Sequence, residues 1–97
     1  MDTSKFRVIE RCNQQINERI IHRMNEWEID QLIDRLVKVK RDIMFYVDML
    51  EEPKRSVIYK RYILNMSWER ISDETGYNSS TVRLLHDAAM RDLERCP

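Results

Sequence analysis

The sequence predicts an all-α fold built from long helices. One glycine and two prolines occur among 97 residues, so few positions interrupt a helix. Over residues 26–51, apolar side chains recur at alternating three- and four-residue intervals, which is the spacing of one helix face. Residues that favour helix starts, Asn25, Ser67 and Asn78, precede segments with helical spacing.

Two long helices are expected in the N-terminal half, over residues 4–24 and 26–51. In the first, the apolar stripe consists of Phe6, Ile9, Ile16 and Ile20. The second is preceded by Asn25-Glu26-Trp27-Glu28, a predicted N-cap with a carboxylate three residues later. Its stripe consists of Ile29, Leu32, Leu36, Val39, Ile43, Tyr46 and Leu50, and Ile33, Val37, Met44 and Val47 widen it.

The segment 26–51 is too apolar to stand alone in water, and three partners for it are open. It packs on the first helix as a hairpin, on the C-terminal unit, or on a second copy as a coiled coil. We therefore expect residues 1–52 to be a helical arm. Its roles would be contact with host RNA polymerase or self-association, as a homodimer through residues 4–50.

Residues 53–97 are expected to form a separate domain of three helical segments with short connections. The first runs from Pro53, a residue suited to a first helical turn, to Leu64, and it stops at Asn65-Met66. Its inward residues are Val57, Ile58, Tyr62 and Ile63, and its outward residues are Lys54, Arg55, Lys60 and Arg61.

The second and third segments of this domain are joined at the only glycine. The second begins at the N-cap Ser67, carries small Ser72 on its inner side, and ends at Gly76 in a left-handed turn. Tyr77 is expected to tuck back as an apolar plug. The third segment begins at Asn78 or Ser79 and buries Val82, Leu85, Ala89 and Leu93.

Two helices joined by a short glycine-containing turn form the pattern of a helix-turn-helix. In that motif, the second helix enters the major groove of double-stranded DNA with its exposed N-terminal side. That side is predicted to carry Ser79, Ser80, Arg83, Leu84 and Asp87. Arg83 is suited to guanine or to a phosphate, and Leu84 to a thymine methyl group. The helix-start amides near Ser67 and Trp68 are suited to phosphate oxygens.

Three stretches, RYI (61–63), SWERI (67–71) and GYNSSTVRLLH (76–86), resemble known regulators. They are similar to the C-terminal region of phage-encoded activators of the RinA and ArpU type, from Gram-positive bacteria and their prophages. They also resemble region 4 of bacterial sigma factors. The resemblance covers residues 53–93. It implies promoter binding as an activator with the host polymerase, Ser79, Ser80, Arg83 and Leu84 facing bases, and Arg61, Arg70 and Arg91 facing the DNA backbone.

Charge and composition set limits on cell location and partners. The net charge is zero, but residues 54–97 carry eight basic and six acidic side chains, a net +2, against −2 for residues 1–53. This tilt has the sign expected of a DNA-binding end. There is no long apolar run or signal peptide, and Cys12 and Cys96 form no CxxC pair. We expect a cytoplasmic protein of a bacterial host cell, with no membrane contact.

Catalysis is not expected. The single glycine excludes glycine-rich phosphate loops, and neither His22 nor His86 has a partner at metal-ligand spacing. We therefore predict no catalytic residue, metal or cofactor. Two alternatives remain beside transcription regulation: a DNA-packaging adaptor similar to a small terminase subunit, and a protein-interaction module that does not bind DNA.

Overall fold

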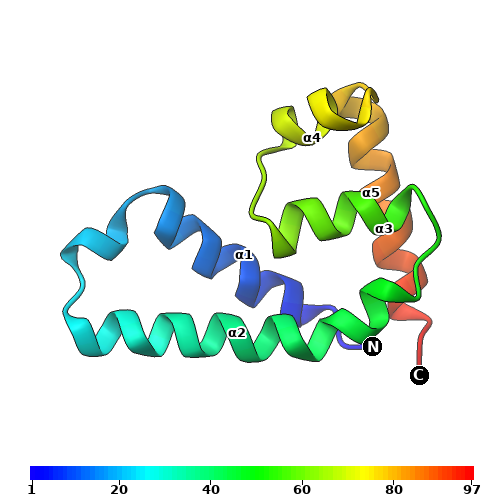
Figure 1. Cartoon of the computed structure of the whole chain (residues 1–97). Helices are drawn as coiled ribbons and strands as arrows, with labels where there is room; N and C mark the ends of the chain where they lie inside the picture. The colour runs from blue at the N-terminus through cyan, green and yellow to red at the C-terminus, as the bar shows by residue number, and fades with distance from the viewer.

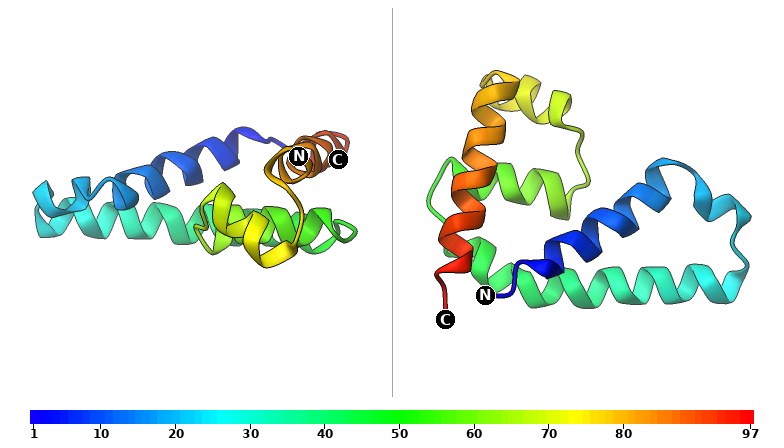
Figure 2. Two further views of the ribbon diagram at one scale, coloured as in Figure 1. Left: turned by 90° about the horizontal axis from the view of Figure 1, so that it is seen from above. Right: turned by 180° about the vertical axis from the view of Figure 1, so that it is seen from behind.

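The computed structural model describes all 97 residues, and it is all-helical with no strands. Helices α1 (Ser4–Asn17) and α2 (Glu26–Asp48) form a V whose arms meet near the N-terminus (Figure 1). Helices α3 (Lys54–Ile58), α4 (Trp68–Thr75) and α5 (Ser79–Glu94) follow, and α5 descends along α3 towards the end of α2 (Figures 1 and 2). None of the helices combines the length and apolar character needed to span a bilayer.

The first helix is shorter than the apolar pattern predicts. α1 ends at Asn17, and Arg19 takes a left-handed conformation with a φ of 58°. A single 3-10 turn, η1 (Ile20–Arg23), then leads towards α2, and Ile20 is exposed. The prediction of one helix over residues 4–24 is therefore wrong after Asn17, because the last isoleucine of the stripe has no core to enter.

α2 begins as its sequence predicts, but it ends at Asp48 rather than at residue 51. The Asn25 side chain accepts a hydrogen bond from the Glu28 amide, and the Glu28 carboxylate accepts one from the Asn25 amide, which completes the capping box. Leu32, Ile43 and Val47 are buried. Leu36, Val39 and Tyr46 pack partly buried against the main core. The prediction that Ile33 and Val37 widen the buried stripe is wrong, because these side chains are 49% and 48% exposed.

The segment after α2 contains an irregular turn that the helical spacing does not predict. α3 continues without a break into a π-helical turn, η2 (Tyr59–Ile63), which has one extra residue per turn. The chain then stops being helical at Asn65, whose φ is 55°, as the sequence predicts. η2 carries Arg61 and Tyr62, so this turn sets the direction of two side chains of the candidate site.

Nine buried residues from both halves of the chain form the main core. They are Phe6 and Ile9 from α1, Ile43, Val47 and Leu50 from the α2 region, Ile58 and Tyr62 from α3 and η2, and Ala89 and Leu93 from α5. A second, smaller cluster joins α3, α4 and α5 through Val57, Ile71 and Val82. Residues 1–52 and 53–97 thus share one core, and α5 is anchored in both clusters.

Candidate nucleic-acid interface

The N-terminal half of α5 has one buried side and one bare side. The Asn78 side chain caps the helix by accepting a hydrogen bond from the Thr81 amide at 2.8 Å. Val82 is fully buried on the inner side. The bare side carries every residue that the sequence places there: Ser79, Ser80, Arg83, Leu84 and Asp87. Leu84 is 67% exposed, so this side presents an apolar group among polar ones.

The connection between α4 and α5 is three residues long. Gly76 has a φ of 78°, the left-handed conformation that the sequence predicts. The Ser72 hydroxyl donates a hydrogen bond to the Tyr77 carbonyl, and the Tyr77 amide donates to Thr75 Oγ1. The Tyr77 side chain is 39% exposed, so the prediction of an apolar plug is wrong. Tyr77 holds the turn through its backbone, and its side chain belongs to neither core cluster.

A tryptophan at the start of α4 contacts two arginines through its ring. The guanidinium carbon of Arg61 lies 4.4 Å from the centre of the Trp68 ring, and that of Arg83 lies 4.2 Å from it. Both distances are within the range of cation–π contacts, which stabilise exposed pairs by about 0.5–1 kcal/mol. Trp68 also packs against the smaller core cluster. The indole therefore connects η2, α4 and the bare side of α5.

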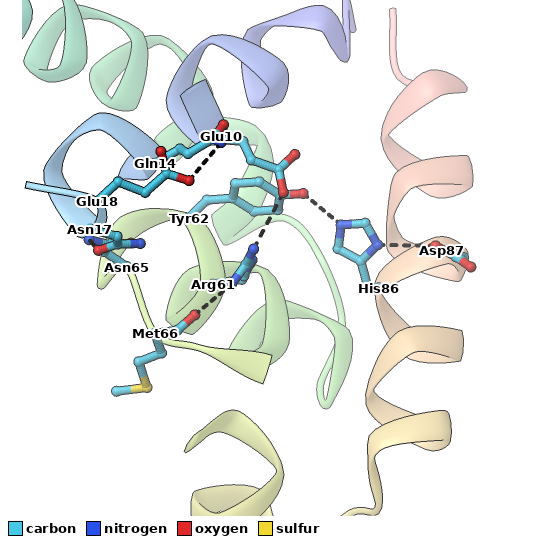
Figure 3. A network of polar contacts seen from close by, with 10 residues as sticks. All are labelled: Glu10, Gln14, Asn17, Glu18, Arg61, Tyr62, Asn65, Met66, His86 and Asp87. Carbon is cyan, nitrogen blue, oxygen red and sulfur yellow. Dashed lines mark hydrogen bonds and ion pairs between the residues drawn. The ribbon is translucent and has the colours of Figure 1, made fainter. Parts of the chain in front are cut away.

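Arg61 bonds to two other segments of the chain (Figure 3). One terminal nitrogen donates a hydrogen bond to the Met66 carbonyl at 3.0 Å, and the other lies 3.4 Å from Glu10 Oε1 on α1. Its side chain is only 20% exposed. The sequence predicts a DNA-backbone contact for Arg61, but the structure engages this guanidinium within the protein.

Tyr62 and His86 join the core to the outer side of α5 (Figure 3). Tyr62 Oη lies 2.7 Å from His86 Nε2, and His86 Nδ1 lies 3.1 Å from Asp87 Oδ1. Burial raises the pKa of Tyr62 to about 12, so its hydroxyl keeps its proton. A neutral His86 can then accept from Tyr62 at Nε2 and donate from Nδ1 to the carboxylate. His86 also meets the Trp68 ring edge-on, at 5.1 Å between centres.

The remaining predicted contact residues lie around this centre. Ser67 caps α4 by accepting a hydrogen bond from the Arg70 amide. Arg70 is 66% exposed on the side chain and pairs with Glu74 at 3.7 Å, while Arg91 is exposed on α5. The first backbone amides of a helix have no carbonyl in a preceding turn to accept their hydrogen bonds. The amides of Trp68 and Ser79, at the starts of α4 and α5, are therefore left available to an outside acceptor.

A polar cleft of about 300 Å³ lies behind Arg61, between α1 and η2. It is lined by Glu10, Asn13, Gln14, Asn17, Glu18, Arg61, Tyr62 and Asn65. The amides of Asn17 and Asn65 exchange two hydrogen bonds across it, of 3.1 and 2.9 Å. Asn13 Oδ1 is buried without a partner. No group of three or more His, Cys, Asp or Glu side chains is placed to hold a metal ion.

Comparisons with models of known protein families, with curated proteins and with solved structures find no match for this chain. We therefore infer function from the residues themselves.

The sequence predicts the bare side of α5, but it does not predict the contacts of Trp68 with Arg61 and Arg83 or the contact between Tyr62 and His86. One signal was available for part of this arrangement: Arg83 and His86 are three residues apart, so they share a helix side that faces the same neighbour.

Proposed function

We propose that this chain binds double-stranded DNA, with the N-terminal half of α5 in the major groove and α4 against the phosphate backbone. The observation that carries the proposal is the two-sided character of α5. Its inner side is anchored in both core clusters, and its outer side is exposed to solvent over Ser79, Ser80, Arg83 and Leu84. A helix supported in this way can enter a groove without any rearrangement of the core.

In this proposal Arg83 is the main contact to bases, and Trp68 and Arg61 position it. The indole supports one side of the Arg83 guanidinium, whose nitrogens remain able to donate hydrogen bonds to guanine O6 and N7. Arg61 lies over the same ring and also bonds to Glu10 and Met66. We therefore assign Arg61 to positioning, in place of the phosphate contact that the sequence suggested.

Phosphate contacts are assigned to groups that flank this centre. The outward amides at the starts of α4 and α5, near Trp68 and Ser79, favour phosphate oxygens because the helix dipole is positive there. Arg70 and Arg91 are exposed and add positive charge on either side. In the proposed role, the chain regulates phage or prophage promoters with host RNA polymerase, in the cytoplasm of a bacterial cell, as its resemblance to RinA- and ArpU-type activators implies.

Fluorescence anisotropy of labelled genomic and random duplexes at two salt concentrations tests this proposal. We expect an affinity that falls as salt rises, and a loss on Arg83→Ala of about 1–3 kcal/mol if the contact to guanine is bidentate. Arg23→Ala is the matched control, because it removes the same charge from η1, at the far end of the V (Figure 1). Equal losses for the two variants, or no affinity at low salt, would contradict the proposal.

A second pair of variants separates positioning from contact. Trp68→Leu keeps an apolar side chain at the start of α4 and leaves the charge unchanged, but it removes the support of Arg83. We expect it to weaken binding to the preferred duplex more than binding to random DNA. A ring of more than two subunits that binds DNA without promoter preference would instead indicate a packaging adaptor.

A further inference from the structure

The side of α2 that faces away from the core carries two of the most exposed aromatic side chains in the molecule. Trp27 is 69% exposed and Phe45 is 68% exposed. They are 18 residues apart, which is five turns of an α-helix, so both point in the same direction about 27 Å apart. In Figure 1 this helix forms the lower edge of the molecule, with α1 above it.

Among the charged residues that point the same way as Trp27 and Phe45, the charges are divided by sign; exposed Arg35 and Asp42 point about 60–80° away around the helix. Asp30 and Asp34 follow Trp27, whereas Lys38 and Arg41 precede Phe45, and all four are exposed. We call these six residues the outer face of α2: Trp27, Asp30, Asp34, Lys38, Arg41 and Phe45. Read from either end, this face is an aromatic residue followed by two charges of one sign.

This order is complementary to itself when one copy is reversed. About a midpoint at residue 36, Trp27 lies opposite Phe45 and Asp34 lies opposite Lys38. The exact counterpart of Asp30 is Asp42, which points away from this side and pairs with Lys5, so the residue that faces Asp30 is Arg41, one position earlier. Equivalent positions also share nearly the same direction around the helix, as a two-fold axis across the helix requires. Val37, 48% exposed, lies beside the midpoint and adds an apolar contact there.

We propose that the outer face of α2 binds a second copy of this chain, with the two α2 helices antiparallel. Each end of the interface then stacks Trp27 of one copy on Phe45 of the other, and the centre holds ion pairs between opposite charges. A parallel arrangement would place like charges opposite each other along the whole face. The face has no net charge, which disfavours nucleic acid as its occupant.

The charged groups of this face are free to make such pairs. Asp30 and Arg41 form no ion pair within the chain. Asp34 and Lys38 are paired at 3.0 Å, but both side chains are more than half exposed, and such surface pairs contribute little. The apolar stripe predicted for a coiled coil packs, buried or partly buried, within the chain, so this interface uses a different side of α2. The proposal does not depend on DNA binding.

Charge reversal followed by analytical ultracentrifugation tests the proposal, from about 10 µM to about 1 mM, which covers weak to moderate affinities. We expect the native protein to dimerise, and we expect Asp34→Lys or Lys38→Glu alone to weaken the dimer more than about tenfold through like-charge contacts. The double variant, Asp34→Lys with Lys38→Glu, restores opposite signs and should restore the dimer. Because both side chains are exposed, we expect each variant to fold, and circular dichroism checks that its helix content is unchanged.

A mixing experiment checks the pairing independently of any single variant. One variant carries Asp30→Lys and Asp34→Lys, and the other carries Lys38→Glu and Arg41→Glu. Each should be monomeric alone, and an equal mixture should form a one-to-one dimer. A native protein that stays monomeric up to about 1 mM, a dimer unaffected by single reversals, or a double variant that fails to recover would each overturn the proposal.

Discussion

Gly76 ends α4 in a conformation that side chains with a Cβ rarely adopt. Its φ is 78°, and a Cβ added there would meet no atom within 4 Å. Substitution therefore introduces no steric overlap, and the cost is that of the left-handed backbone alone, about 1–2 kcal/mol for an ordinary residue. The lower entropy of the unfolded alanine variant offsets about 0.4–1 kcal/mol of this. We expect Gly76→Ala to destabilise the chain by about 1 kcal/mol.

Urea unfolding of a short series at this position separates backbone strain from other effects. Asn tolerates the left-handed region, so Gly76→Asn should cost less than Gly76→Ala, and β-branched Gly76→Val should cost the most. For a domain of this size, 1 kcal/mol corresponds to a shift in Tm of about 4–8 °C. Equal stability across the series, or an alanine variant more stable than the native chain, would show that this residue is not held in the left-handed conformation.

Three further substitutions test the contacts that hold the site. Tyr62→Phe should lower the free energy of unfolding by about 1 kcal/mol, because His86 loses a hydrogen-bond partner; an unchanged urea midpoint would contradict that contact. Leu93→Ala should cost about 2–5 kcal/mol and leave a single transition, whereas two transitions by circular dichroism would mean that the halves do not share a core. The hydrogen bond from Lys54 lowers the pKa of Asp92, so this carboxylate stabilises the fold above about pH 4 and less on acidification. Asp92→Asn should therefore be less stable than the native chain at pH 7, with a difference in stability that closes as the pH falls through the lowered pKa of Asp92; a difference independent of pH would refute it.

The sequence predicts helix starts and the Gly76 turn correctly because these depend on neighbouring residues. Asn25, Ser67 and Asn78 each cap a helix through an amide three positions later. The exposed side of α5 is also predicted correctly, because the spacing of its apolar residues fixes which side is buried. The end of α1 was not predictable from local signals, since neither glycine nor proline marks the break at Arg19.

The contacts that position the site depend on residues far apart in the sequence. Tyr62 and His86 are 24 positions apart, and Glu10 and Arg61 are 51 apart. The π-helical turn that orients Arg61 and Tyr62 keeps an ordinary helical apolar pattern, so periodicity does not reveal it. The prediction that Tyr77 packs as an apolar plug was wrong because it rested on the aromatic ring, whereas the turn uses the carbonyl and amide of Tyr77.

Chemical-shift mapping by NMR is the most direct test of the proposed DNA-binding surface. A short duplex is added to the isotope-labelled full chain at low salt, and the backbone amides are followed. We predict the largest changes over residues 78–87, with smaller ones at the start of α4 and none on the outer face of α2. Changes confined to α1 and α2, or an unchanged spectrum at saturating duplex, would contradict binding through α5.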